Sequence, residues 1–337
     1  MFEGHGDDLY RYSGKIKHNF STNILSGVDH TGLLDHLRND QGGITCYPEP
    51  YPWSLEARIA VEKGCPAANV VVTSGAVDAI YRLASLYARC SSAISRPSFR
   101  EYQDACKLYD HQISFFDSLG AIPGESDMIW LCNPDNPTGR VWPAEELLDL
   151  AGRCRETLVV IDQAYEDYTL KRVIAPEEAL AAENIVLLSS LTKRYAVPGL
   201  RIGYLIGPEE LCGKIRERSL PWAISGPASS AANYLLGHTD DYRIPAVALH
   251  SEALRVSEAF RQLGIECGET DCNFILCRLP EGMKAAQFKE FLAEVYGILI
   301  RDASNFEGLD SRYFRIAAQT AAENDLLIKA VSEWMRG

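Results

Sequence analysis

Short, continuously apolar runs alternate with amphipathic stretches between about residues 70 and 207. The apolar runs are typical of strands buried on both faces of a parallel sheet. They are Val70–Thr73, Met128–Leu131, Leu158–Ile161 and Ile185–Leu188. The stretches with helical periodicity are Ala76–Arg89, Arg100–Tyr109 and Ala144–Glu156. This alternation predicts an α/β fold in which a mostly parallel sheet is sandwiched by helices.

The pattern changes after about residue 237, where helices and short strands predict a smaller α+β domain. The elements expected there are helices at Ala246–Leu263 and Ala285–Val295, strands at 274–276, 298–300 and 314–316, and a last helix. Thr320 and Glu323 have the spacing of a capping box that would begin this last helix. We therefore expect a large α/β domain at residues 38–237, and a small domain that joins an N-terminal arm, residues 1–37, to residues 238–337.

Composition and charge narrow the classes of function. The 337 residues are 47% hydrophobic and 23% charged, which are ordinary globular values, and no apolar run is long enough to cross a bilayer. The 33 Lys and Arg against 46 Asp and Glu give a net charge of −13, which argues against general electrostatic binding to nucleic acids or anionic membranes. The first residues do not resemble a signal peptide, so we expect a cytoplasmic protein.

Cysteine and histidine spacing gives no sign of a metal site. The ten cysteines include no CxxC pair, and the seven histidines include no HExxH motif. We expect reduced, mostly buried thiols and no bound metal.

The segment at residues 189–204, SSLTKRYAVPGLRIGY, carries the most informative chemistry. Lys193 follows a predicted buried strand, at the sheet edge where ligand pockets open in α/β folds. A single lysine is usually a solvated surface residue. Here, however, Ser190, Thr192 and Arg201 add hydroxyls and a fork-shaped cation that suit a phosphate. A lysine amine beside a phosphate site is what pyridoxal phosphate requires, because the amine binds the aldehyde of the cofactor.

Further features agree with this cofactor. Asp162 ends an apolar run, with Tyr165 three residues later, and a buried carboxylate there would keep the pyridine nitrogen protonated. The turn Thr73–Ala76 follows a strand and opens a helix whose free N–H groups can bind a phosphate. Taken singly, the aspartate could cap a helix or bind a metal, and the turn could be a plain connection. The loop Asn133–Gly139, after another strand, completes the set.

In this order the motifs resemble those of the fold type I pyridoxal-phosphate enzymes related to aspartate aminotransferase. Over nearly its whole length the chain is similar to the branch that contains histidinol-phosphate aminotransferase and L-threonine O-3-phosphate decarboxylase. Three longer segments follow the decarboxylase pattern more closely, namely residues 190–207, 220–222 and 298–317. The resemblance implies decarboxylation of L-threonine O-3-phosphate to (R)-1-amino-2-propanol O-2-phosphate, a step of cobalamin biosynthesis.

The resemblance also implies a role for each residue that matches a cofactor-binding position. Lys193 would bind the cofactor covalently and later shuttle protons, and Asp162 would pair with the pyridine nitrogen. Asn136 and Tyr165 would hydrogen-bond the phenolic oxygen, while Phe99 would stack on the ring. The cofactor phosphate would be bound by Gly75, Ala76, Ser190, Arg201 and, across a homodimer interface, the partner subunit's Tyr47.

For the substrate, a small phosphorylated amino acid, the resemblance implies that Arg315 binds the carboxylate. The candidates for its phosphate are His5, Asn23 and Arg301. The chain departs from the family pattern near these positions, since Asp7 replaces a glycine, Ile24 a proline, and Gln319 a frequent arginine.

Two alternatives stay open. A histidinol-phosphate-type aminotransferase that uses 2-oxoglutarate would employ the same residues but break the Cα–H bond instead of the Cα–carboxylate bond. A non-catalytic binding protein could also share the fold.

Overall fold

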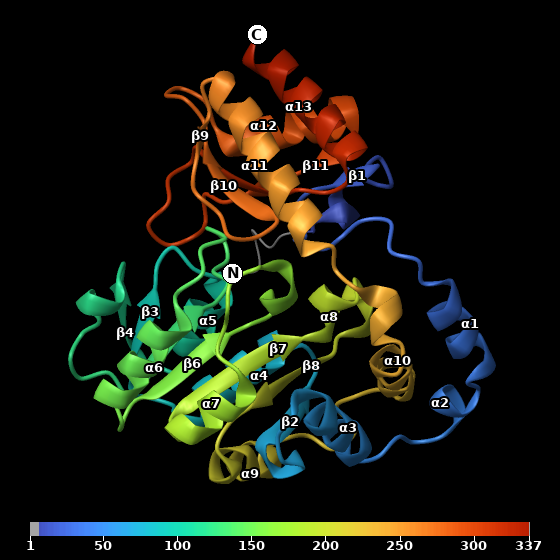
Figure 1. Ribbon diagram of the computed structural model, residues 1–337, viewed down its shortest axis with the longest axis vertical. Coiled ribbons are helices and arrows are strands. Elements are labelled where there is room, and N and C mark those ends of the chain that lie inside the picture. The colour runs from blue at the N-terminus through green and yellow to red at the C-terminus, as the bar shows by residue number, and fades with distance from the viewer. Residues whose placement is uncertain (1–6, 337) are drawn as a thin grey trace.

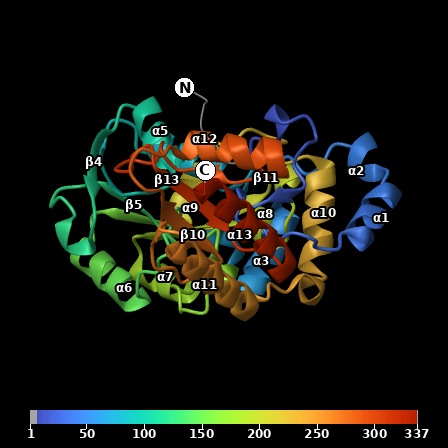
Figure 2. The same cartoon turned by 90° about the horizontal axis from the view of Figure 1, so that it is seen from above.

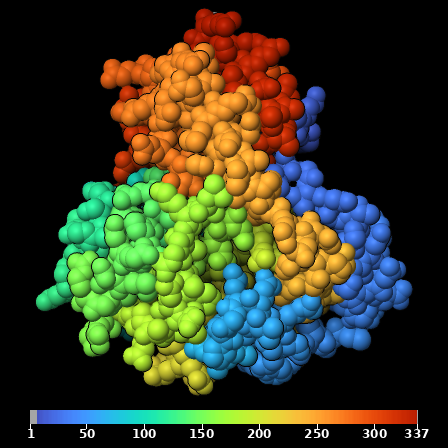
Figure 3. Space-filling view, viewed as in Figure 1, coloured from blue at the N-terminus to red at the C-terminus, as the bar shows by residue number. Residues whose placement is uncertain are grey.

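The computed structural model describes residues 7–336, which form one large sheet with helices on both faces and a smaller unit above it (Figure 1). The predicted fold class is confirmed, because the architecture is α/β with a mostly parallel central sheet. The space-filling view shows the smaller unit, built mainly from the C-terminal third, seated on the larger one (Figure 3). The boundaries at residues 38 and 237 stay a prediction.

The large sheet has seven strands in the order β2-β8-β7-β6-β5-β3-β4. Their bounds are β2 Val70–Thr73, β3 Ser91–Ser95, β4 Gln112–Phe116, β5 Met128–Cys132, β6 Leu158–Asp162, β7 Ile185–Ser190 and β8 Gly203–Ile206. Strands β3 to β7 pair in parallel, and β8 is antiparallel to both β7 and β2. The carboxyl ends of β5, β6 and β7 therefore lie side by side at one edge.

Alternate residues of the strands enter separate cores on the two faces of this sheet. In β5, Ile129 and Leu131 pack on one face, while Met128, Trp130 and Cys132 pack on the other. Helices α3, α6, α7 and α10 cover the first face, and α4, α5 and α9 cover the second. The helices of this part are α1 Thr31–Asn39, α2 Gly42–Thr45, α3 Trp53–Lys63, α4 Ala76–Leu86, α5 Arg100–Leu108, α6 Ala144–Arg153, α7 Pro176–Ala182, α8 Leu191–Arg194, α9 Glu209–Glu217 and α10 Gly226–Leu236.

The smaller unit has a four-stranded antiparallel sheet in the order β12-β13-β10-β9, with α11, α12 and α13 above it when the molecule is seen from the top (Figure 2). The N-terminal strand β1 joins this unit by pairing in parallel with β11. The bounds are β1 His18–Asn19, α11 Ala246–Gln262, β9 Glu266–Cys267, β10 Phe274–Arg278, α12 Ala285–Phe291, a π-helical turn Leu292–Tyr296, β11 Ile298–Leu299, β12 Arg301–Asp302, β13 Tyr313–Ala317 and α13 Ala321–Met335. The predicted capping box at Thr320 and Glu323 is confirmed.

Short 3₁₀ turns link these elements at Leu9–Arg11, Ala67–Asn69, Glu166–Tyr168, Leu119–Ala121, Pro198–Leu200 and Thr239–Tyr242. None of the helices within residues 7–336 is long and apolar enough to cross a membrane. Across the same range, no three His, Cys, Asp or Glu side chains are grouped as metal ligands.

Two differences from the predicted elements have clear physical reasons. Strand β3 is not predicted from apolar residues because its sequence is SSAIS. Ser92 is nevertheless fully buried, with its hydroxyl hydrogen-bonded to His111 and Trp130. The predicted strand 298–300 is divided, because β11 pairs with β1 and β12 pairs with β13 in another sheet.

Candidate active site

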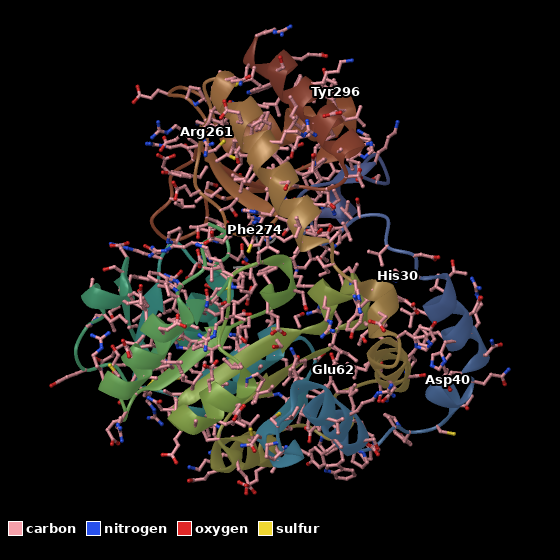
Figure 4. The ribbon with its side chains drawn as sticks, in the orientation of Figure 1. His30, Asp40, Glu62, Arg261, Phe274 and Tyr296 are labelled. Atoms are coloured by element: carbon pink, nitrogen blue, oxygen red, sulfur yellow. The ribbon has the colours of Figure 1, made fainter. Side chains whose placement is uncertain are left out.

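A pocket of about 270 Å³ opens where the carboxyl ends of β5, β6 and β7 face strands β12 and β13 of the smaller unit. Figure 4 labels Phe274, the first residue of β10, at this junction between the two units. The predicted site residues that line the pocket are Ala76, Phe99, Asn136, Asp162, Tyr165, Ser190, Lys193, Arg201, Arg301 and Arg315.

Lys193 enters the pocket from α8, the single helical turn that directly follows β7. Its Nζ donates a hydrogen bond of 2.9 Å to the carbonyl oxygen of Thr22 and lies 5.6 Å from the ring centroid of Tyr165. Burial and then the positive charge of Arg315 lower the pKa of the Lys193 amine to about 8. The amine can therefore be neutral, and so nucleophilic, within a pH unit or so of neutrality.

Asp162 is the last residue of β6 and is 5% exposed. Its Oδ1 accepts a hydrogen bond of 2.9 Å from the backbone N–H of Ala164, and its Oδ2 accepts one of 2.8 Å from the hydroxyl of Tyr102. Burial raises the pKa of Asp162, while these two donors and the charge of Lys193 oppose that shift. The carboxylate is thus fixed in orientation and faces the pocket beside Lys193.

An anion cradle forms at the N-terminus of α4, where β2 turns into the helix. Gly75 has φ +83°, and a Cβ at this position would lie 2.6 Å from Nη2 of Arg201. The missing side chain therefore lets the guanidinium approach the helix N-terminus. On the other side, a Cβ on Gly203 of β8 would lie 2.6 Å from the backbone nitrogen of Ala76, so this glycine allows the strand to pass close beneath the turn. Ser190 also lines the pocket.

Two arginines face the pocket from the smaller unit. Arg315 of β13 is 4% exposed, and it donates hydrogen bonds to Oδ1 of Asn136 and, at 2.5 Å, to the carbonyl oxygen of Ser21. Arg301 of β12 is 6% exposed and donates at 2.8 Å to Oδ1 of Asn305. Burial lowers the pKa of each guanidinium to about 10, and for Arg301 the charge of Arg315 adds to this effect. Two buried cations side by side suit an anionic ligand.

Aromatic residues form the remaining walls. Tyr165 is 6% exposed and packs edge-to-face on Phe274 with ring centroids 5.0 Å apart. Burial raises the pKa of the Tyr165 hydroxyl, so it stays protonated and able to donate a hydrogen bond. Phe99 also lines the pocket and packs edge-to-face on Tyr102 with ring centroids 5.8 Å apart.

Comparison with known proteins gives the family. A family model for aminotransferase class I and II matches residues 15–331. The chain belongs to the aminotransferase class I and II family. A threonine-phosphate decarboxylase from Salmonella typhimurium is 28% identical over 90% of this chain and 86% of that protein. A histidinol-phosphate aminotransferase from Methanococcus maripaludis is 25% identical over 89% of this chain and 85% of that protein.

A solved structure extends the comparison to three dimensions. The crystal structure of an L-threonine-O-3-phosphate decarboxylase from Porphyromonas gingivalis matches with a TM-score of 0.92 and 35% identity, over 95% of this chain and 100% of that chain. The predicted resemblance to fold type I enzymes of this branch is therefore confirmed.

Enzymes of the aminotransferase class I and II family depend on pyridoxal phosphate, so the predicted cofactor is confirmed at the level of the family. The residues that line the pocket also fit pyridoxal phosphate. The hydroxyl of Thr192, a residue that lines the pocket together with Arg201, is buried without a hydrogen-bond partner among the described residues. A phosphate there would meet this hydroxyl, the free N–H groups of α4 and the guanidinium of Arg201. Lys193 and Asp162 line the same pocket and suit the aldehyde and the pyridine nitrogen.

The predicted site residues Asn23 and Tyr47 do not line the pocket. Asn23 is fully buried next to the site but does not line the pocket, and its amide atoms lack a hydrogen-bond partner in the described part of the chain. Tyr47 is 86% exposed and does not line its own chain's pocket. His5 lies outside the described residues, and the roles of all three stay predictions.

The structure adds contacts at the site to which the sequence assigns no role. Tyr102 bonds Asp162, the carbonyl of Thr22 accepts from Lys193, and Asp7 lines the pocket from the N-terminal segment. Of these residues, Tyr102 alone could have been found from the sequence. It lies three residues after Phe99, and residues with this spacing lie on the same face of a helix. The other two contacts depend on how the N-terminal segment folds back over the sheet.

Proposed function

We propose that the protein decarboxylates L-threonine O-3-phosphate and releases (R)-1-amino-2-propanol O-2-phosphate, with pyridoxal phosphate as its cofactor. The observation that carries this proposal is the presence of two buried arginines, Arg301 and Arg315, in the pocket that holds Lys193. The substrate carries a carboxylate and a phosphate besides its amine, so each arginine has an anion to bind. Similarity to two threonine-phosphate decarboxylases supports the same substrate.

Arg315 is the residue for the carboxylate. Its guanidinium is held in place by Asn136 and Ser21, and its Nε is buried with no hydrogen-bond partner among the described residues. That N–H is a donor available to a ligand, and a buried donor without a partner is costly. Arg301, on the neighbouring strand, is then the residue for the substrate phosphate.

The reaction needs a negative charge at the substrate Cα to be stabilised and a proton to be returned there. When bound, pyridoxal phosphate supplies an electron-accepting ring for that charge. Asp162 would keep the ring nitrogen protonated, because its carboxylate faces the pocket beside two fixed donors. Lys193, whose pKa lies at about 8, can both hold and release a proton near neutral pH and would return one to Cα.

In this proposal the enzyme is a homodimer in which the partner subunit's Tyr47 reaches the cofactor phosphate. Within one chain, Tyr47 packs on Trp222 with ring centroids 5.3 Å apart, and both rings are more than half exposed. Exposed aromatic side chains of this kind suit a protein interface. Sedimentation of the purified protein at the mass of two chains is the expected result.

Transamination of histidinol phosphate is the second candidate, favoured by the similarity to a histidinol-phosphate aminotransferase. The same residues would serve a reaction that breaks the Cα–H bond, because the outcome depends on which bond stands perpendicular to the ring. This reaction requires an amino acceptor, whereas decarboxylation does not.

The experiment incubates purified holoenzyme with L-threonine O-3-phosphate in the absence of any keto acid, and follows carbon dioxide and the amine product. The proposal expects many turnovers from the wild-type protein and none from a Lys193→Ala variant. A protein that releases no carbon dioxide, but converts histidinol phosphate only when 2-oxoglutarate is added, would establish the second candidate instead.

A further inference from the structure

Tyr102 is a buried hydroxyl donor that lines the pocket beside Asp162. It lies in the first turn of α5, is 1% exposed, and donates a hydrogen bond of 2.8 Å to Oδ2 of Asp162. Its ring stacks on Trp130 of β5 with centroids 5.9 Å apart and an interplanar angle of 22°. The indole N–H of Trp130 is in turn bonded to the hydroxyl of Ser92 at 3.3 Å. This packing leaves the Tyr102 hydroxyl one fixed position, against the carboxylate.

The tyrosine can act only as a donor in this position. Burial and then the negative charge of Asp162 raise the pKa of Tyr102 well above its ordinary value, so the phenol keeps its proton. The neighbouring thiol of Cys132 is also held protonated by burial, and it donates to the carbonyl oxygen of Pro134 at 3.0 Å. Of the three neighbouring side chains Tyr102, Cys132 and Asp162, Asp162 is thus the one whose charge is free to change.

The bond acts against the effect of burial on Asp162. Burial favours the neutral acid, whereas the hydroxyl of Tyr102 and the N–H of Ala164 favour the charged carboxylate and occupy one oxygen each. With both oxygens fixed, the carboxylate cannot rotate away from the pocket that it lines. Losing either donor would remove orientation and charge together.

We propose that Tyr102 is a positioning residue, which keeps Asp162 ionised and aimed at the pyridine nitrogen of the cofactor. The inference rests on the cofactor site of the proposed function and not on the identity of the substrate. In this role Tyr102 would raise the proton affinity of the ring nitrogen. It would thereby also raise the rate of any reaction that needs an electron-accepting ring.

The test compares Tyr102→Phe with a matched control, Tyr12→Phe. Tyr12 is 3% exposed, and its hydroxyl also donates to a carboxylate, Glu290, at 2.9 Å, but it packs with the π-helical turn Leu292–Tyr296 and β11 and does not line the pocket. Both holoenzymes are prepared with cofactor labelled with ¹⁵N in the ring. The nitrogen resonance is then titrated with pH in the absence of substrate.

We expect Tyr102→Phe to lower the proton affinity of the ring nitrogen by about tenfold to a hundredfold, the effect of removing one hydrogen bond to a charged group. The kcat for the substrate should fall by a similar factor while KM changes little, and Tyr12→Phe should titrate like the wild type. A Tyr102→Phe nitrogen titration that superposes on the wild type overturns the inference, whether or not decarboxylation is observed.

Replacement of Tyr102 by 3-fluorotyrosine gives a second arm that keeps the ring and the fold. The more acidic phenol is a stronger donor, so the proton affinity of the ring nitrogen should rise and not fall. A shift in the same direction as that of Tyr102→Phe would contradict the inference. Failure of all variants and the wild type to bind the cofactor would instead reject the proposed function.

Discussion

Arg301 and Arg315 are directly opposite each other on the antiparallel strands β12 and β13, and both guanidinium groups line the same pocket. Directly opposed residues point to the same face of a sheet, so the two cations share one buried space. Such a pair is unfavourable without counter-ions, and it becomes favourable when a ligand brings two anionic groups. In the proposed function, this pair would favour a substrate that carries two anionic groups.

Substitution of each arginine by glutamine should show which anionic group of the substrate that arginine binds. Arg315→Gln should weaken binding of L-threonine O-3-phosphate by about tenfold to a hundredfold, the value of a lost hydrogen bond to a charged group. It should leave binding of the product, which has no carboxylate, close to the wild-type value. Arg301→Gln should weaken binding of substrate and product alike, as calorimetry with each ligand would show. Equal losses for product in both variants would contradict the assignment of Arg315 to the carboxylate.

The rate at which the cofactor-free protein captures pyridoxal phosphate should rise with pH and level off above about 8, the pKa of Lys193. The sign follows from the reaction, because only the neutral amine attacks the aldehyde, and the neutral fraction grows as pH passes the pKa. Arg315→Gln should move the midpoint upward, since the positive charge of Arg315 helps to lower this pKa. Stopped-flow absorbance would measure both. A capture rate that keeps rising up to a pH of about 10.5, the ordinary pKa of lysine, would contradict the account.

Gly75→Ala should impair the cofactor phosphate site. The new Cβ would lie 2.6 Å from Nη2 of Arg201, at a φ of +83° that L residues rarely adopt. The combined strain, about 1–3 kcal/mol, corresponds to a loss of roughly tenfold to a hundredfold in cofactor affinity if the arginine is displaced. Gly152→Ala in α6 is the control, because no atom lies within 4 Å of its Cβ, and it should leave affinity unchanged and raise stability slightly. Fluorescence titration with pyridoxal phosphate distinguishes the two, and wild-type affinity in Gly75→Ala would exclude this cradle.

The ion pair between Asp8 and Lys289 should stabilise the N-terminal segment that brings Asp7 to the pocket. Both side chains are about nine-tenths buried, with Nζ to Oδ2 at 2.6 Å. Lys289→Met should cost about 3 kcal/mol, because it leaves the buried carboxylate of Asp8 with the longer contact to Arg11, whose Nε lies 3.8 Å from Oδ2. Lys15→Met removes an exposed pair with Glu294 and should cost about 1 kcal/mol or less. Denaturant unfolding of the two variants provides the measurement, and similar losses would contradict the predicted difference.

The parts of the site that follow strands could be predicted from the sequence. An apolar run locates the end of a strand, and the end of a strand in a parallel sheet locates the pocket. The sequence therefore predicts Asp162 and Lys193 at one edge of the sheet, and both line the pocket there. The same reasoning anticipated the turn at Gly75. The polar residues that directly follow each apolar strand belong to short motifs. Their positions are set by the end of the strand and depend little on the rest of the fold.

The remaining contacts depend on packing between segments far apart in the chain. The bond from Tyr102 to Asp162 joins residues 60 positions apart, and the bond from Lys193 to Thr22 joins residues 171 apart. No local pattern marks a backbone carbonyl as a lysine partner. Strand β3 was missed for a related reason, since its serines become suitable for a core only through distant partners such as His111.

The most direct test of the central claim is the number of carbon dioxide molecules released per subunit from carboxyl-labelled L-threonine O-3-phosphate in the absence of a keto acid. The account predicts a count that grows linearly well beyond one, is unchanged by added 2-oxoglutarate, and matches the amine product. No release would contradict decarboxylation as the activity of this pocket, and so would a count that stops at or below one per subunit.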